Sequence, residues 1–89
     1  MKKPIKSTKC GKIVFVEKLL GRERAVGLAY QGEGLIEIDP RQTSKEYMDT
    51  VIHESLHMFF PDWTERKVKV SSRKLSSILW KYGYRRVDL

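Results

Sequence analysis

The pattern of hydrophobic and polar positions changes in character near Pro40. Before it, short runs rich in β-branched and aromatic residues alternate with glycine-containing turns, a pattern typical of strands. Three strands are predicted, at 12–18, 25–30 and 35–39. Because short turns separate them, a three-stranded antiparallel meander is the simplest arrangement.

After Pro40 the apolar positions recur at helical spacing, and a first helix is predicted. Thr43 and Glu46 match a capping box, so the helix should begin near Ser44. It should end at Phe60, because a proline follows. On a helical wheel one apolar face is predicted to lie on the sheet, formed by Met48, Ile52, Ser55, Leu56 and Phe59.

A second capping box, Asp62 with Glu65, predicts another helix that runs to Tyr82 and is terminated by Gly83. Its predicted buried stripe consists of Val68, Leu75, Leu79 and Tyr82. The fold class is therefore predicted as α+β: a small antiparallel sheet followed by two helices, in a single domain over residues 1–89. Residues 1–11 are expected to form a flexible, basic N-terminus.

The size of the chain limits how its fold can be stabilised. A chain of 89 residues buries only about 60–65% of the surface that its unfolded form exposes. Cys10 is the only cysteine, so no intramolecular disulfide is available, and a metal ion or an oligomer would have to help. No apolar run approaches the length of a membrane span. We expect a soluble protein of the cytoplasm.

The charge balance favours anionic partners. Eighteen Lys and Arg residues against eleven Asp and Glu residues give a formal net charge of +7. The cations cluster at both ends of the chain, without any recognisable nucleic-acid-binding motif. Weak association with nucleic acid through this basic surface is one interpretation, and an ordinary solvated surface is the other.

Both histidines of the chain lie in the sequence HESLH, residues 53–57. On a helix, His53 and His57 lie one turn apart, so both imidazoles can bind a single zinc ion at about 2.0–2.1 Å. Glu54 points about 100° away from His53, which places it to reach a water molecule on the ion. Both histidines also point away from the apolar stripe. The spacing therefore predicts a zinc site with Glu54 as general base.

A catalytic zinc site usually takes three protein ligands, so a third one is needed. Glu65 borders the face of the second helix that should fold back on the first, which makes it the favoured candidate. As part of a capping box it could instead bond to the backbone of Asp62. Asp62 is an alternative ligand, Cys10 and Asp39 are distant ones, and a site without a third ligand here stays open.

The sequence HESLH is similar to the HExxH motif of zincin metalloproteases. With the flanking "IEIDP" and "FFPDWTE", the region from residue 35 to about 82 resembles small phage- and prophage-encoded metallopeptidase-like proteins, and more distantly the ImmA/IrrE-like and SprT-like families. The resemblance implies a zincin-like domain with His53, His57 and Glu65 as zinc ligands and Glu54 as general base. If the protein is phage-encoded, its compartment is the host cytoplasm.

The resemblance also implies a peptide or protein substrate that pairs, in extended form, with an edge strand. That strand would contain Leu35, Ile36, Glu37 and Ile38. No glycine and third histidine follow His57 at the spacing of metzincins. No residue is singled out by spacing to stabilise an oxyanion, although several are available: Tyr30, Arg41, Tyr47, Tyr82 and Tyr84.

Two further interpretations compete with a zinc-dependent peptidase. The zinc ion could be purely structural, because a domain this small gains folding free energy from a metal. The chain could also be a metal-free, basic module associated with nucleic acid, in which the histidine pair is incidental. Against a purely structural ion, Glu54 would then have no role.

Overall fold

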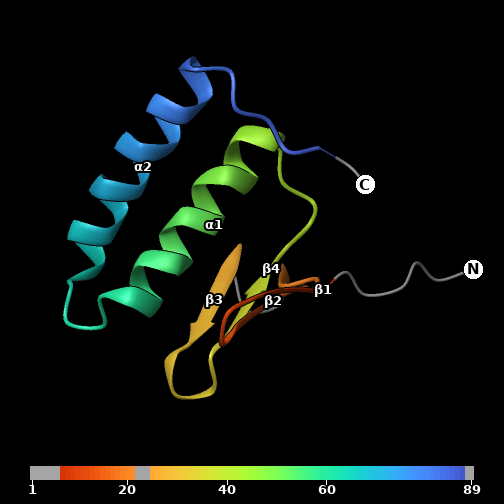
Figure 1. The fold of residues 1–89 in the computed structure, drawn as a ribbon, viewed down its shortest axis with the longest axis vertical. Helices are drawn as coiled ribbons and strands as arrows, with labels where there is room; N and C mark the ends of the chain where they lie inside the picture. Colours follow the sequence, from red (N-terminus) through yellow and green to blue (C-terminus); the bar gives the residue numbers. More distant parts are fainter. Residues whose placement is uncertain (1–6, 22–24, 88–89) are drawn as a thin grey trace, which may run out of the picture.

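A computed structural model describes residues 7–21 and 25–87 of the chain. It shows an α+β fold in which a sheet is followed by two helices, as the sequence predicts (Figure 1). The elements are β1 (Ser7–Cys10), β2 (Ile13–Glu17), β3 (Gly27–Tyr30), a short 3₁₀ turn η2 (Gln31–Glu33), β4 (Leu35–Ile38), α1 (Ser44–Phe59) and α2 (Glu65–Lys81).

The sheet differs from the predicted antiparallel meander. It has four strands in the order β1-β2-β4-β3, and β2 and β4 run parallel while the outer pairs are antiparallel. Strand β4 enters between β2 and β3, so Ile36 pairs with Phe15 on one side and Ala29 on the other. Ile36 is 0% exposed as a result. The meander prediction was wrong because such non-local pairing leaves no mark on local sequence.

The first strand was not expected. Ser7–Cys10 lies within the segment predicted to be flexible, but it pairs with β2 through a turn in which Gly11 has φ +60°. All four of its residues are exposed, and it forms one edge of the sheet. Exposed polar residues and lysine are common on edge strands, which explains why its composition resembles a tail. Residues 1–6 lie outside the described part.

Helix α1 begins as predicted, with both halves of the capping box at Thr43 and Glu46 present. Its orientation on the sheet is different, because its buried residues are Thr50 and Glu54 rather than the apolar stripe. Phe59, predicted to face the sheet, is 61% exposed. Strand β3 presents Gly27 to the buried residues, and a Cβ there would lie 2.7 Å from Cγ2 of Thr50. The small glycine thus lets a polar helix face come close to the sheet.

Helix α2 starts two residues later than a cap at Asp62 would place it. The N-cap is Thr64, whose hydroxyl accepts a hydrogen bond from the backbone N–H of Lys67 at 3.2 Å. The helix ends at Lys81, close to the predicted terminator Gly83, which has φ +92°. Its start therefore contradicts the second capping box, while its end agrees with the prediction.

The buried stripe of α2 consists of Val68, Ser72 and Ser76. Of the four residues predicted for that stripe only Val68 is fully buried, and Leu75 and Tyr82 are exposed. Serine side chains are small, so α1 and α2 can approach closely, and the hydroxyl of Ser76 donates to Oδ1 of Asp49 on α1 at 3.1 Å. A hydrophobic periodicity cannot reveal such a contact.

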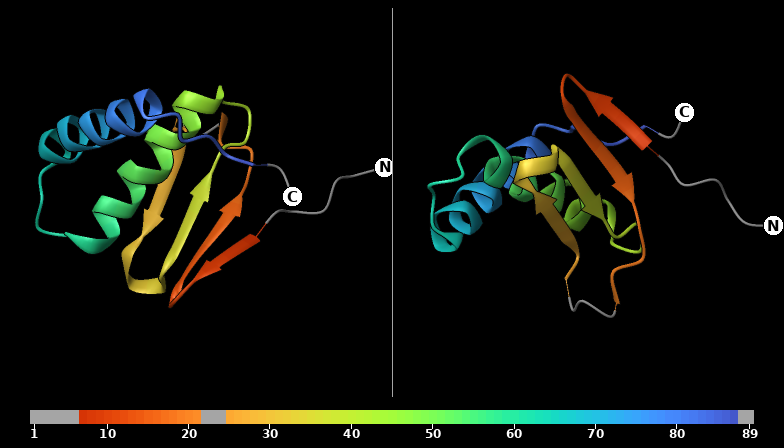
Figure 2. Two further views of the ribbon diagram at one scale, coloured as in Figure 1. Left: turned by 45° about the horizontal axis from the view of Figure 1, so that its top comes forward. Right: turned by 90° about the horizontal axis from the view of Figure 1, so that it is seen from below.

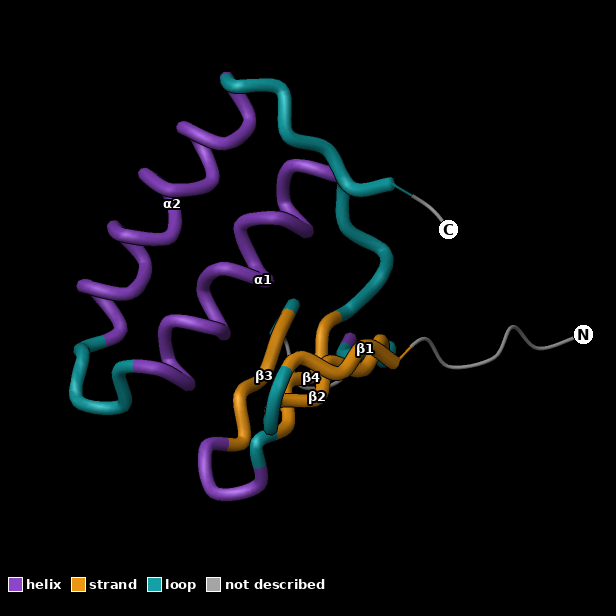
Figure 3. Tube along the Cα trace, viewed as in Figure 1, coloured by secondary structure: helices purple, strands orange, loops and turns teal. Residues whose placement is uncertain are grey.

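The two helices form an antiparallel hairpin, with α1 between α2 and the sheet (Figures 1 and 2). The loop colouring of Figure 3 shows the C-terminal tail returning past the start of α1. There Arg86 lies over the ring of Tyr47 and forms an ion pair with Glu17 at 3.1 Å. Neither helix combines the length and the apolar composition required to cross a bilayer.

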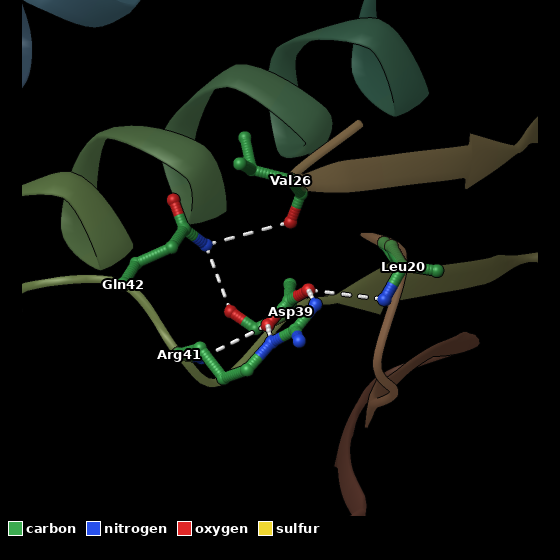
Figure 4. A network of polar contacts seen from close by, with 5 residues as sticks. All are labelled: Leu20, Val26, Asp39, Arg41 and Gln42. Carbon is green, nitrogen blue, oxygen red and sulfur yellow. Dashed lines mark hydrogen bonds and ion pairs between the residues drawn. The ribbon is translucent and has the colours of Figure 1, made fainter. Parts of the chain in front are cut away.

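The junction between β4 and α1 is fixed by the buried carboxylate of Asp39 (Figure 4). It accepts hydrogen bonds from the backbone N–H of Leu20 at 3.0 Å and from the guanidinium of Arg41 at 2.7 and 3.0 Å. These bonds, led by that of the Arg41 side chain, hold the pKa of Asp39 well below its usual range despite burial. Gln42 extends the network by bonding to the Asp39 carbonyl and to Thr50 of α1.

Candidate metal centre

The two helices bring His53, His57 and Glu65 together. The histidines lie one turn apart on α1, with ring centroids 4.9 Å apart, and Glu65 is the first residue of α2. Nε2 of His53 lies 2.7 Å from Oε1 of Glu65, and Nε2 of His57 lies 2.7 Å from Oε2. One ligand atom from each residue can be chosen so that all lie within 4.8 Å of one another. The three residues could therefore hold a metal ion.

The start of α2 explains why Glu65 is available. Because Thr64 caps the helix, Glu65 occupies the first helical position and its carboxylate contacts the histidines. A back-bond from Glu65 to Asp62, the competing use foreseen from the sequence, does not form among the described contacts. Asp62 and Cys10 do not join the metal group, and the Asp39 carboxylate is occupied by Arg41.

The donor set suits zinc. Two imidazole nitrogens and one carboxylate oxygen are the ligands of many catalytic zinc sites, which leave a fourth position for water or substrate. Both histidines are partly buried, whereas the Glu65 side chain is 66% exposed. The group is thus open to solvent on the side of Glu65. Within the described ranges no other group of this kind is present.

Glu54 lies on the neighbouring face of α1, toward β3, with 8% of its surface exposed. A Cβ on Gly27 would lie 2.9 Å from Cγ and 3.2 Å from Oε2 of Glu54, so the carboxylate sits against the backbone of β3. Burial raises its pKa, while His53 and His57 oppose that change. The charges of His53, His57 and Glu65 all act on this carboxylate, so Glu54 lies near the metal group.

Two polar contacts to the histidines were not foreseen from the sequence. The side chain of Gln31, in the turn after β3, donates to the carbonyl of His57 at 2.8 Å. Oγ of Ser72 on α2 lies 3.4 Å from Nδ1 of His53. The only signal for either in the sequence is a polar residue in a turn and a serine in an amphipathic helix, and both are too common to be informative.

The strand predicted to bind substrate is not an edge strand. Strand β4, with Leu35, Ile36, Glu37 and Ile38, is paired on both sides and has no free edge for a peptide. The strand beside α1 at the sheet margin is β3, which pairs only with β4 within the described part. A substrate that adds to the sheet near Glu54 would therefore have to pair with β3.

The candidates for oxyanion stabilisation are dispersed. The hydroxyl of Tyr47 donates to Glu17 at 2.6 Å, on the side of α1 away from the metal group. Arg41 is bound to Asp39, and the hydroxyl of Tyr30 donates to Glu37 at 2.9 Å. The remaining two candidates, Tyr82 and Tyr84, follow the C-terminal end of α2, opposite Glu65.

A second concave region lies on the other side of α1. This apolar groove has a volume of about 630 Å³ and is lined by Met48, Val51 and Ile52 of α1 together with residues of the sheet and the C-terminal tail. Two of these residues belong to the stripe predicted to lie on the sheet. None of the candidate metal ligands lines it.

Comparison of the chain with models of protein families, with curated proteins and with solved structures finds no match. Function therefore has to be inferred from the side chains that the fold brings together.

Proposed function

We propose that the protein is a zinc-dependent metallopeptidase of the HExxH type. One observation carries the proposal: the two carboxylate oxygens of Glu65 each lie 2.7 Å from Nε2 of a different histidine of the motif. Three donors from two helices thus converge, and the remaining motif residue, Glu54, is buried beside them. An accidental match to the HExxH motif would not explain why the carboxylate of Glu65 lies beside both histidines.

Each residue has a defined role in this proposal. His53, His57 and Glu65 would hold the zinc ion, which supplies Lewis acidity that lowers the pKa of water toward about 7 and polarises a carbonyl. Glu54 would take a proton from the attacking water and return it to the nitrogen of the departing amine. The close approach of Glu54 to Gly27 of β3 supports this role, because a substrate near that strand would lie close to the carboxylate.

The substrate is proposed to be a peptide or an unfolded protein segment. Strand β3 forms an edge of the sheet next to α1, and an extended peptide could pair with this edge by backbone hydrogen bonds. Such a peptide would pass Gly27, where no side chain separates it from Glu54. The strand proposed to bind substrate is therefore β3, and not β4 as the sequence predicts.

The test uses Glu54→Gln, with Glu33→Gln as a matched control in the exposed turn after β3. Hydrolysis of fluorescently labelled casein and bound zinc are measured on the same protein preparations. We expect Glu54→Gln to retain zinc and to lose at least about 100-fold in rate, since a general base contributes 10²–10⁴-fold. Glu33→Gln should match the wild type in zinc content and in rate. A chelator should abolish the activity of the wild type and of Glu33→Gln.

The possible outcomes separate the competing functions. If Glu54→Gln cleaves casein as fast as the wild type, the catalytic assignment is overturned although the metal centre stands. If the wild type binds zinc but cleaves nothing, the ion is structural and stabilises a small domain. If no zinc binds, the peptidase proposal fails as a whole.

A second candidate function is suggested by the exposed face of α2. Its cations form no ion pair with any acid in the described ranges: Arg66, Lys69, Arg73, Lys74 and Lys81. Together with the net charge of +7, this face is complementary to a nucleic-acid backbone. Fluorescence anisotropy with a labelled duplex of about 20 base pairs would test it. Binding that weakens steeply with salt and ignores chelator would favour this function, and absence of binding at low salt would exclude it.

A further inference from the structure

Ser72 is the fully buried polar residue of α2 closest to the metal group. It is 0% exposed and faces α1, where its Oγ lies 3.4 Å from Nδ1 of His53. The same hydroxyl lies 3.1 Å from the backbone carbonyl of Lys69, one turn earlier on α2. The hydroxyl of Ser72 thus connects the imidazole of His53 to the backbone of the second helix.

The chemistry of these partners suggests a direction for the chain of hydrogen bonds. A carbonyl oxygen can only accept, and it is the closer partner, so the single proton of the Ser72 hydroxyl is directed to Lys69. The oxygen of Ser72 then accepts a proton from Nδ1–H of His53. A neutral imidazole with its proton on Nδ1 carries a lone pair on Nε2, the atom that faces Glu65 at 2.7 Å.

This lone pair faces a carboxylate oxygen, which also offers only lone pairs. Two acceptors at this distance repel one another unless a proton or a metal cation lies between them. The arrangement is therefore suited to a cation shared by Nε2 of His53, Nε2 of His57 and the carboxylate of Glu65. Metal-binding histidines usually donate the proton of their other nitrogen to such a partner, which fixes the tautomer and the ring orientation.

We propose that Ser72 is a positioning residue for the metal: by accepting the Nδ1 proton of His53 it orients the Nε2 lone pair toward the ion. This role rests on the metal centre of the proposed function and assigns a part of it to a residue outside the HExxH motif. His57 has no comparable side-chain partner at Nδ1 among the described contacts. His53 is thus the ligand whose orientation is set before the ion arrives.

Ser76 provides a matched control. It lies one turn after Ser72 on the same face of α2, is 3% exposed, and its hydroxyl also bonds to α1, through Oδ1 of Asp49 at 3.1 Å. Replacing either serine by alanine removes one buried hydroxyl from the same helix interface. Only Ser72 contacts a candidate metal ligand, so a difference between the two variants cannot come from the interface alone.

The experiment compares zinc affinity of the wild type, Ser72→Ala, Ser76→Ala and Ser72→Thr by competition with a chromophoric chelator. We expect Ser72→Ala to weaken zinc binding by about 10–100-fold, the effect of removing a hydrogen-bond partner of a ligand. Ser76→Ala should stay within about threefold of the wild type, and Ser72→Thr, which keeps the hydroxyl, should bind more tightly than Ser72→Ala. Circular dichroism and urea unfolding verify that each variant is folded.

A measurement on the wild type does not depend on any variant. Long-range ¹H–¹⁵N spectra of the metal-free protein with neutral imidazoles should show His53 protonated at Nδ1, and a proton on Nε2 would overturn the role of Ser72. Equal zinc affinity of Ser72→Ala and Ser76→Ala would also overturn it, leaving the metal centre intact. A wild type that binds no zinc overturns the metal centre, and the role of Ser72 with it.

Discussion

The two sides of α1 contrast in composition and in burial. Toward β3 and α2 the helix presents a polar seam made of Asp49, Thr50, His53 and Glu54, which pack against Gly27, Ser72 and Ser76. Toward the C-terminal tail it presents Met48, Val51 and Ile52, which line the open apolar groove. The buried residues of α1, Thr50 and Glu54, belong to the polar seam.

Hydrophobicity alone would predict that the apolar side of α1 is buried and the polar side is exposed. The observed burial of the polar side therefore needs an explanation. Buried polar groups are costly unless each has a partner, and every buried side-chain nitrogen and oxygen in the described part has one. The small residues Gly27, Ser72 and Ser76 make room for these contacts. The seam is therefore a built polar site, whereas the groove is incompletely covered apolar surface.

The largest expected effect comes from removing a candidate metal ligand in the seam. His53→Ala should weaken zinc binding by more than about 100-fold, because the loss exceeds that of an outer-shell partner. Zinc at a hundred times its dissociation constant should raise the free energy of unfolding of the wild type by about 2.7 kcal/mol, and that of the variant very little. Thermal unfolding with and without zinc measures this. Ser55→Ala, also on α1, should keep the full zinc response, and an equal loss there would contradict a site-specific effect.

Next in size is the effect of Asp39, the anchor at the junction between β4 and α1. Asp39→Asn should lower the free energy of unfolding by about 1.5–3 kcal/mol at neutral pH, since it weakens several hydrogen bonds to a buried charge. Urea unfolding at a series of pH values measures this loss.

The pH dependence follows from the lowered pKa of Asp39 in the folded state. The folded protein binds the proton more weakly than the unfolded chain, so the carboxylate stabilises fully above about pH 4 and progressively less as the pH falls toward the folded pKa. The difference between wild type and Asp39→Asn should therefore shrink below about pH 4. A difference that stays constant down to pH 2 would show that the charge of Asp39 is not responsible.

Close packing in the seam predicts a smaller but specific effect at β3. Gly27→Ala places a Cβ 2.7 Å from Thr50 and 2.9 Å from Glu54, which forces the strand and α1 apart and should cost about 1–3 kcal/mol. Gly32→Ala is the control, because nothing lies within 4 Å of its added Cβ. Unfolding in urea compares the two. Equal stability of both variants would mean that β3 does not pack closely on α1.

The smallest effect is expected in the apolar groove. Met48→Ala should cost about 1 kcal/mol or less, because Met48 is only partly buried and solvent already reaches the groove. The same urea series measures it. A loss as large as that of Asp39→Asn would show that the groove is filled in solution and would remove the contrast between the two sides of α1.

Local features of the site were predictable from sequence. The spacing of His53 and His57 determines their relative position once the helix forms, and the capping box at Thr43 determines where it starts. The position of Glu65 at the border of the predicted helix interface favours it as the third ligand, although the cap that frees its carboxylate is Thr64 and not Asp62. Side-chain chemistry at fixed spacing within a helix is encoded locally.

The structural features that the sequence did not predict depend on distant parts of the chain. The position of β4 between β2 and β3 follows from pairing across the sheet, and nothing within 35–38 distinguishes a central strand from an edge strand of this length. The rotation of α1 depends on Gly27, some twenty residues earlier, which allows Thr50 and Glu54 to reach the sheet. The contact of Ser72 with His53 likewise joins residues of two different helices, so the sequence around Ser72 does not reveal it.

The candidate ligands His57 and Glu65 are only eight positions apart in the chain. A bridge between them closes a very short loop, and short loops cost little entropy to close. An ion could therefore be captured by the helical hairpin before the strands have assembled, and it would act as an early template for folding. Folding would then begin in the C-terminal half of the chain, and the strands would pack on a helical hairpin that the ion already holds together.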